Sequence, residues 1–219
     1  MSKVELSKPL LIYFYGFPGS GKSYVSRSLT TVMKAAHING DRIRSELFET
    51  PRYDTQENAI VAHLMDYMAE EFLGAGISVI YDINATRLNQ RRKLRELAKK
   101  HKADSLMIWL QIDPESAFYR IQNRDRRTSD DRYAQNHSQE SFNKHLSTMQ
   151  NPQAEDYLVI SGKHTFTTQK AAIINRLYQM SLISSGNVQS NMTKPELVNL
   201  VPNPHNGRVD FSRRNITIR

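Results

Sequence analysis

Cysteine is absent from this chain of 219 residues, which excludes disulfide-stapled folds and any thiolate metal site. A chain without cysteine suits a reducing compartment, so we expect a cytoplasmic protein. Long hydrophobic runs are also lacking. The compact apolar stretch nearest the N-terminus covers only residues 9–15, far short of a membrane span, and we expect no membrane partner. The seven histidines show no H-E-x-x-H or similar spacing, so we predict no zinc site.

Acidic residues are outnumbered by basic ones. The chain has 22 Asp and Glu against 30 Lys and Arg, a formal net charge of +8. This excess favours anionic partners such as a nucleotide, a nucleic acid or a phosphorylated metabolite. The length is that of one domain with a substantial core, or of one domain with an appendage.

Residues 16–23 read GFPGSGKS, which matches the phosphate-binding pattern G-x-x-x-x-G-K-[ST] without departure. The glycines allow backbone N–H groups to surround a polyphosphate, and Lys22 can reach its outer phosphates. The Ser23 hydroxyl can bind Mg²⁺, and a helix that begins here turns its positive end toward the anion. We therefore expect ATP and Mg²⁺ as ligands. The expected nucleotide contacts are Gly16, Pro18, Gly19, Ser20, Gly21, Lys22, Ser23 and Tyr24.

Apolar runs typical of strands alternate with helical patterns from residue 9 to about 183, which predicts an α/β domain with a five-stranded parallel sheet. The expected strands are 10–15, 36–39, 77–82, 106–112 and 157–160. The expected helices are 23–34, 55–73, 87–101, one opened by Asp113, 138–149 and 168–183.

The chain divides into a P-loop domain, residues 1–183, and a tail, residues 184–219. A polar, arginine-rich stretch at about 120–137 is the expected lid. The tail has three prolines and few apolar residues, so we expect an extended segment rather than a second domain. Its end, 209–219, partly alternates between apolar and polar residues. A disordered tail and a strand added to a sheet edge remain alternatives.

Two aspartates follow predicted strands, at the edge where ligands of an open α/β sheet bind. Asp41 follows the second strand and Asp82 the third. Asp41 suits the general base that accepts a proton from an acceptor hydroxyl, or it caps the helix that follows. Asp82 suits a magnesium-side carboxylate, either in phosphoryl transfer or as a Walker-B-type ligand in an ATPase.

Basic residues gather in two further places. The arginines of 120–132 lie among aspartates, so they form either a lid over the phosphates or a solvated ion-pair face. The helix at 87–102 carries eight basic residues against one acid, Glu96, and its outer surface is either solvated or a nucleic-acid contact. Trp109, inside a strand run, is expected in the core.

The stretch 38–45, INGDRIRS, resembles the strand-end motif of the kinase domain of phage-type polynucleotide kinase, and 79–84, VIYDIN, with Arg91 and Arg92 downstream, resembles a second motif of that family. Zeta-toxin-like and chloramphenicol-phosphotransferase-like kinases share this layout. The resemblance covers residues 9–165 and implies an adenylate-kinase-like P-loop fold, a three-layer sandwich with a helical lid. Departures are Ile83 in place of a common threonine and two extra residues before Arg91. The phage enzyme's phosphatase half has no counterpart in this sequence.

Carried over by position, the resemblance gives Asp41 the role of general base and Arg44 that of a clamp on the acceptor side. A helix-surface position is the alternative for Arg44. Lys22 takes the phosphates, Ser23 and Asp82 the magnesium side. The lid arginine that neutralises transition-state charge is then one of Arg124, Arg126 and Arg127.

These residues together predict an ATP- and Mg²⁺-dependent kinase that phosphorylates a hydroxyl group. A polynucleotide or RNA 5′-hydroxyl and a small metabolite remain alternative acceptors. An ATPase switch or a nucleic-acid-binding module without an alcohol acceptor is the competing hypothesis.

Overall fold

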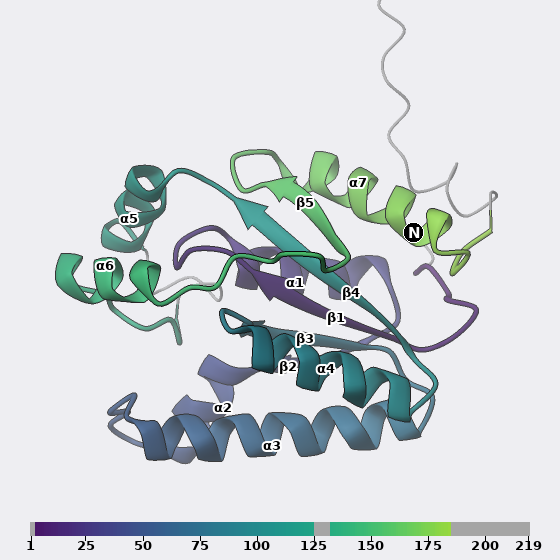
Figure 1. Ribbon diagram of the computed structural model, residues 1–219, viewed down its shortest axis with the longest axis horizontal. Helices are drawn as coiled ribbons and strands as arrows, with labels where there is room; N and C mark the ends of the chain where they lie inside the picture. Colours follow the sequence, from purple (N-terminus) through teal and green to yellow (C-terminus); the bar gives the residue numbers. More distant parts are fainter. Residues whose placement is uncertain (1–2, 125–131, 185–219) are drawn as a thin grey trace, which may run out of the picture.

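A five-stranded parallel sheet with the order β2-β3-β1-β4-β5 forms the centre of the protein (Figure 1). The computed structural model describes residues 3–124 and 132–184. Arg126, Arg127 and all but the first residue of the predicted tail lie outside these residues. The strands are β1 (Leu10–Tyr15), β2 (Ala36–Asn39), β3 (Val79–Asn84), β4 (Asp104–Gln111) and β5 (Tyr157–Ser161).

Seven helices connect and cover the strands in the described part of the chain. They are α1 (Lys22–Val32), α2 (Gly40–Leu47), α3 (Thr55–Gly74), α4 (Leu88–Lys100), α5 (Pro114–Gln122), α6 (Gln139–Ser147) and α7 (Phe166–Gln179). The expected alternation of strands and helices and the parallel sheet are confirmed. The third strand begins and ends later than predicted, so Asp82 lies inside it rather than at its end.

Alternation along β1 builds two cores, one on each face of the sheet. Leu10, Ile12 and Phe14 pack in the core that α1 and α7 cover. Leu11, Tyr13 and Tyr15 pack in the core that α3 and α4 cover. Every residue of β1 is buried, which explains why its sequence is an unbroken apolar run. The three layers are visible in Figure 1, with α5 and α6 packed together beyond the ends of β1 and β4.

Two helix faces depart from a simple division into apolar and charged sides. Ile60 on α3 is 43% exposed, whereas Glu57 on the same helix is buried. Arg91 was expected on the basic outer surface of α4 but is 1% exposed. Its guanidinium pairs with Glu155 at 2.7 Å and donates to the carbonyl of Ala85.

The basic surface of α4 is reduced further by ion pairs with neighbouring elements. Lys93 pairs with Asp66 at 2.6 Å, and Lys100 pairs with Glu70. Arg95 shares the buried carboxylate that also holds Arg91. These contacts favour a solvated, paired face over a surface for nucleic acid. Along the described chain, no helix combines the length and apolarity that crossing a membrane requires.

Trp109 is half-buried on β4 rather than fully enclosed. Its ring meets Tyr15 edge-on at a centroid distance of 5.2 Å and Tyr157 at 5.4 Å. The three rings extend the core that α3 and α4 cover. Trp109 is therefore a packing residue, close to what the sequence indicates.

Strand order explains where the site lies. β1 occupies the centre of the sheet, so the chain crosses to β3 and β2 on one side and to β4 and β5 on the other. Loops that leave β1 and β4 therefore diverge, and they open a crevice at the carboxyl ends of the strands. The P-loop begins directly after β1, at this crevice.

Candidate active site

The P-loop takes a backbone path that requires glycine. Gly19 has a φ of 81°, and a Cβ there would lie 2.2 Å from the carbonyl oxygen of Ala117. Gly16 has a φ of 148°, and its Cβ would lie 2.5 Å from the carbonyl oxygen of Leu110. α1 then begins at Lys22 without a side-chain cap. The first turn of α1 thus offers its positive end and its N–H groups to an anion, as the sequence predicts.

The Lys22 ammonium is held inside the loop. It donates to the carbonyl oxygens of Gly16 at 2.9 Å and Phe17 at 2.7 Å, and it lies 3.5 Å from the Ser20 hydroxyl. Burial lowers the pKa of Lys22 to about 7, against the attraction of nearby Asp82. An anion in the loop favours the charged ammonium and raises this pKa.

Asp82 is fixed by hydrogen-bond partners from two elements, α1 and β2. It is 6% exposed and accepts from Ser23 Oγ at 3.2 Å, Ser26 Oγ at 2.8 Å and Asn39 Nδ2 at 2.5 Å. His37 Nε2 lies 3.3 Å away on the same carboxylate oxygen. Sequence reasoning found Ser23 and Asp82 but missed the other three as partners of Asp82, although Asn39 lies in the stretch 38–45 that it singled out.

The paired oxygens of Ser23 and Asp82 fit Mg²⁺. Mg²⁺ prefers hard oxygen ligands and commonly takes one or two protein ligands together with substrate phosphates and water. The hydroxyl at the start of α1 and the carboxylate on β3 supply that donor set beside the P-loop. Within residues 3–124 and 132–184 no cluster of three or more His, Cys, Asp or Glu side chains forms a metal cage, so this small donor set is the magnesium candidate.

Asp41 lies in the first turn of α2, but it is not the cap of this helix. Asn39 is the N-cap, and its side chain accepts from the Arg42 backbone N–H at 2.7 Å. The alternative that Asp41 is a capping residue is therefore wrong. Burial, followed by repulsion from Asp82, raises the pKa of Asp41 to about 6, although Arg44 acts in the opposite direction. A carboxylate with this pKa is ionised at neutral pH and is more basic than an ordinary aspartate.

Arg44 is buried at 6% exposure, so the alternative of a solvent-facing helix charge is wrong. Its guanidinium pairs with Glu57 at 3.1 Å, donates to Asn58 Oδ1 at 2.6 Å and lies 4.7 Å from the centre of the Tyr53 ring. Glu57 also accepts from the backbone N–H groups of Arg52 and Tyr53. This ion pair sets the position of Arg44 one turn after Asp41, on the same face of α2.

Arginines of the predicted lid reach the site from the other side. Arg124 Nη1 donates to the Gln135 carbonyl at 2.9 Å, and Arg120 Nη1 donates to the Gly162 carbonyl at 2.9 Å. Both side chains line the cavity described below. Arg126 and Arg127 lie outside the described residues, so Arg124 is the one of the three candidate lid arginines that the structure describes.

Two histidines that sequence reasoning did not single out also line the site. His137 precedes α6 and His145 lies on it, with ring centroids 6.0 Å apart. Burial lowers the pKa of His137 to about 4 and also lowers that of His145, and nearby Lys22 adds to both effects. Both imidazoles are therefore neutral at physiological pH. Scattered histidines give no sequence signal for such a pairing.

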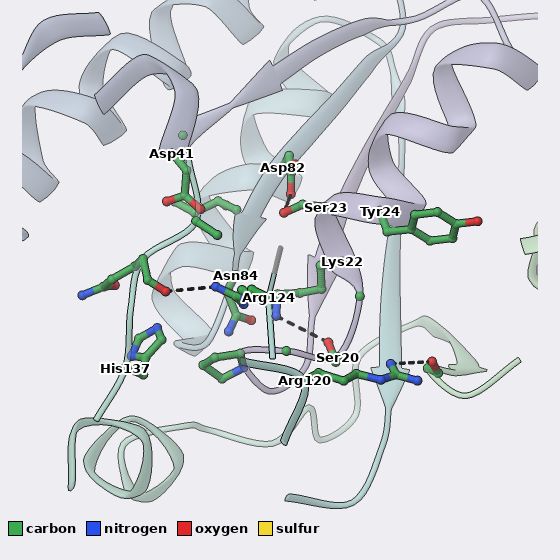
Figure 2. A pocket seen from close by; sticks show the side chains of 18 of the residues that line it. Ser20, Lys22, Ser23, Tyr24, Asp41, Asp82, Asn84, Arg120, Arg124 and His137 are labelled. Atoms are coloured by element: carbon green, nitrogen blue, oxygen red, sulfur yellow. Dashed lines mark hydrogen bonds between the residues drawn. The ribbon is translucent and has the colours of Figure 1, made fainter. Parts of the chain in front are cut away.

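One cavity of about 1040 Å³ joins these residues. Figure 2 shows Lys22, Ser23, Asp41, Asp82 and Arg124 arranged around it. Each predicted nucleotide contact from Pro18 to Tyr24 lines the cavity, whereas Gly16 contributes its carbonyl behind the loop. Sites for a single small ligand range from about 300 to 1,000 Å³, so this volume has room for two reactants.

The cavity has two chemically different ends. Near α2 it is lined by Asp41, Arg44 and Asn58, and near α7 by Tyr24, Arg120 and Phe166. Asp82 and Lys22 lie close enough to Asp41 to shift its pKa, Asp82 upward and Lys22 downward. A carboxylate base, an ammonium group and a guanidinium thus face one reaction space.

Several known proteins share this architecture. A gluconokinase from Sinorhizobium meliloti 1021 superposes with a TM-score of 0.58 and 17% identity, over 78% of this chain and 93% of that chain. The Mycobacterium tuberculosis APS kinase CysC in complex with AMPPNP and APS gives a TM-score of 0.58 and 16% identity, over 78% and 98%. A chain of the Pnkp1/Rnl/Hen1 RNA repair complex gives 0.55 and 20%, over 64% and 44%. At these identities the likeness shows a shared fold.

Similarity in sequence is found with a curated relative and with a family model. Adenylyl-sulfate kinase from Buchnera aphidicola subsp. Schizaphis graminum (strain Sg) is 29% identical over 98 residues, which cover 42% of this chain and 46% of that protein. The chain thus aligns with less than half the length of this relative. A family model described as AAA domain matches residues 11–152, from β1 through the P-loop, Asp41 and Asp82 to the end of α6. Because this match covers well over half of the chain, the protein belongs to the AAA domain family.

Proposed function

We propose that the protein is an ATP- and Mg²⁺-dependent kinase that transfers the γ-phosphoryl group of ATP to a hydroxyl group. The observation that carries this proposal is the position of Asp41. It lines the same cavity as the P-loop, and its raised pKa reflects burial beside Asp82. A carboxylate near a phosphate cradle is the group that transfer to an alcohol needs and that phosphate binding alone does not.

In the proposed reaction Asp41 accepts the proton of the acceptor hydroxyl as its oxygen attacks the γ-phosphorus. The new bond joins that oxygen to phosphorus, and the bond between phosphorus and the β,γ-bridging oxygen breaks, so that ADP leaves. The Lys22 ammonium and the P-loop N–H groups hold the phosphates. Arg124, which lines the cavity, supplies further positive charge to the transferring group.

Magnesium, held by Ser23 and Asp82, supplies charge neutralisation on the phosphate oxygens when it is bound. The carboxylate of Asp82 is held in position for a cation, since Ser26 and Asn39 donate hydrogen bonds to it and limit its rotation. Ser23 also donates to this carboxylate.

The acceptor lies, in this proposal, at the α2 end of the cavity. Arg44 is positioned there by Glu57 and offers its guanidinium to an anionic group near the reacting hydroxyl. The similar proteins are named as kinases of gluconate and of adenylyl sulfate and as an RNA repair complex. A small metabolite and a polynucleotide 5′-hydroxyl are both in keeping with this range. The division into a kinase domain at 1–183, a lid at 120–137 and a tail at 184–219 is part of the same proposal.

The test is a transfer screen with γ-labelled ATP over sugar acids, nucleosides, nucleotides and oligonucleotides, with and without Mg²⁺. We expect labelled product with at least one acceptor, strict Mg²⁺ dependence, and loss of product with Lys22→Ala. Arg92→Ala is the matched control, since Arg92 is an exposed cation on α4 outside the cavity. Release of labelled phosphate to water with no labelled acceptor would refute transfer and favour an ATPase switch.

A further inference from the structure

A second cavity, of about 630 Å³, adjoins the first at the proposed general base. Asp41, Ser23 and Ala134 line both cavities. α2 separates the two cavities, because residues on different faces of this helix line each of them. Gly40, Asp41 and Arg44 line the first cavity, whereas Arg42, Ile43, Glu46 and Leu47 line the second. A molecule that presents a hydroxyl to Asp41 can therefore extend around the start of α2 into the second cavity.

One side of the second cavity is apolar. It is formed by Ile43, Leu47, Leu64 and Met68 from α2 and α3. Leu47 is 48% exposed, although burial of a leucine side chain is favourable. An apolar surface that adjoins a catalytic cavity and stays open to solvent is typical of a place where a ligand binds.

The second cavity is also lined by an aromatic ring and several cations. The guanidinium of Arg132 lies over the ring of Tyr133, with 5.4 Å between the guanidinium carbon and the ring centre. Arg27 and Arg42 also line this cavity, and Arg42 pairs with Glu46 at 4.0 Å. A tyrosine face and a guanidinium plane are surfaces on which flat rings stack.

These surfaces differ from those that a simple sugar acid needs. A polyhydroxylated acceptor requires hydrogen-bond partners around its whole outline, because a buried hydroxyl without a partner is unfavourable. The apolar side of the second cavity offers none, whereas an aromatic or heteroaromatic ring needs few. The combination of Tyr133, Arg132 and four aliphatic side chains fits a ring with a polar edge.

We infer that the second cavity is the outer part of the acceptor site, and that the acceptor carries a planar apolar ring beside its reacting hydroxyl. The ring packs between Tyr133 and the aliphatic side chains of α2 and α3, while the hydroxyl faces Asp41. This inference rests on the proposed kinase function. It separates ring-bearing acceptors, such as nucleosides or aryl alcohols, from acceptors of the gluconate kind.

The first experiment compares two acceptors that differ only in the ring. Adenosine and methyl β-D-ribofuranoside share the furanose and its 5′-hydroxyl, but the second has a methoxy group in place of the base. We expect kcat/KM for adenosine to exceed that for the furanoside at least tenfold. Leu47→Asp and Tyr133→Ala should reduce kcat/KM for adenosine at least tenfold, and should change KM for ATP and kcat/KM for the furanoside less than threefold.

Matched controls exist for both substitutions. Ile77 is 43% exposed and Tyr67 is 56% exposed, and neither lines either cavity. Ile77→Asp and Tyr67→Ala should leave kcat/KM for both acceptors unchanged. Equal kcat/KM values for adenosine and the furanoside would overturn the inference, as would equal losses in the cavity variants and the control variants.

The second experiment measures binding without transfer. 2-Aminopurine riboside is titrated by fluorescence against protein whose donor site is saturated with AMPPNP. We expect Leu47→Asp and Tyr133→Ala to raise its Kd at least tenfold and the two controls to leave it unchanged. A Kd that is the same in the cavity variants as in wild type would refute the ring site. Cavity-dependent binding with no phosphorylation of any acceptor would refute the proposed kinase, and with it the acceptor role, but not the ring site.

Discussion

Replacing Asp41 with asparagine tests two effects of its carboxylate separately, the destabilisation of the folded state and the contribution to catalysis. Asparagine keeps the shape of the side chain and removes its charge. Burial and repulsion from Asp82 raise the pKa of Asp41 from an ordinary 3.8 to about 6. This shift is about two pKa units, and each unit corresponds to about 1.4 kcal/mol, so the ionised carboxylate costs the folded state about 3 kcal/mol at neutral pH. Because a buried amide also loses hydration, we expect Asp41→Asn to raise the free energy of unfolding by about 1 to 3 kcal/mol at pH 7.5.

The sign and the pH window follow from linkage. Asp41 binds its proton more tightly in the folded state than in the unfolded state, so its contribution to stability falls as pH rises from about 4 to 6. Below pH 4 the carboxyl is neutral in both states. The part of the stability difference between wild type and Asp41→Asn that comes from ionisation should therefore shrink to about a third of its pH 7.5 value at pH 4.5. Urea titrations at the two pH values, read by the fluorescence of the single tryptophan, Trp109, measure this difference.

The activity of the same variant should change in the opposite direction. Loss of a general base reduces kcat by roughly 10² to 10⁴. In wild type, kcat/KM should fall about tenfold per pH unit below pH 6, as Asp41 becomes protonated. Asp41→Asn enzyme that retains full phosphoryl transfer would refute the base assignment. A variant that is less stable than wild type at pH 7.5, or equally stabilised at both pH values, would refute the electrostatic argument.

Three further predictions concern the cradle, the metal ligands and the scaffold. Gly19→Ala should abolish measurable ATP binding in calorimetry, because its Cβ would lie 2.2 Å from the carbonyl oxygen of Ala117 at a φ of 81°; unchanged affinity would show that the loop adapts. Ser23→Ala should raise the Mg²⁺ concentration for half-maximal transfer at least tenfold, since it removes one of two proposed ligands, and an unchanged requirement would exclude that role. Glu155→Gln should lower the free energy of unfolding by about 3 to 5 kcal/mol, because it leaves the buried charge of Arg91 unpaired, and a loss below 1 kcal/mol would contradict this account.

Local sequence patterns predicted the central strand, the P-loop and the strand that carries Asp82. The apolar run of β1 is recognisable because both of its faces are buried, and the P-loop because its chemistry needs fixed residue types. Asp82 was predictable from its place on a strand of a parallel sheet. Its three additional donors, Ser26, His37 and Asn39, were not predictable, since they converge only after α1, β2 and β3 pack together.

Buried charges were the main source of error. Arg91 was expected on the outer surface of its helix, because the burial of a charge depends on a partner that the helix itself does not contain. Arg91 meets Glu155 from a segment 64 residues away, and Glu57 meets Arg44 on another helix. The alternative that Asp41 caps α2 was two residues too late, because Asn39 and Asp41 are both favoured at that position and only the backbone geometry separates them.

The position of β1 at the centre of the sheet has a consequence for how such a protein can evolve. Most residues that face the proposed acceptor, apart from Arg132 and Tyr133, come from β2, α2, α3 and β3, on one side of β1. The P-loop belongs to β1 and α1, and Arg120 and Phe166 belong to elements on the other side. Substitutions between residues 36 and 84 can therefore exchange one alcohol for another while the P-loop stays intact. A family built in this way can acquire new substrates largely by altering one stretch of the chain.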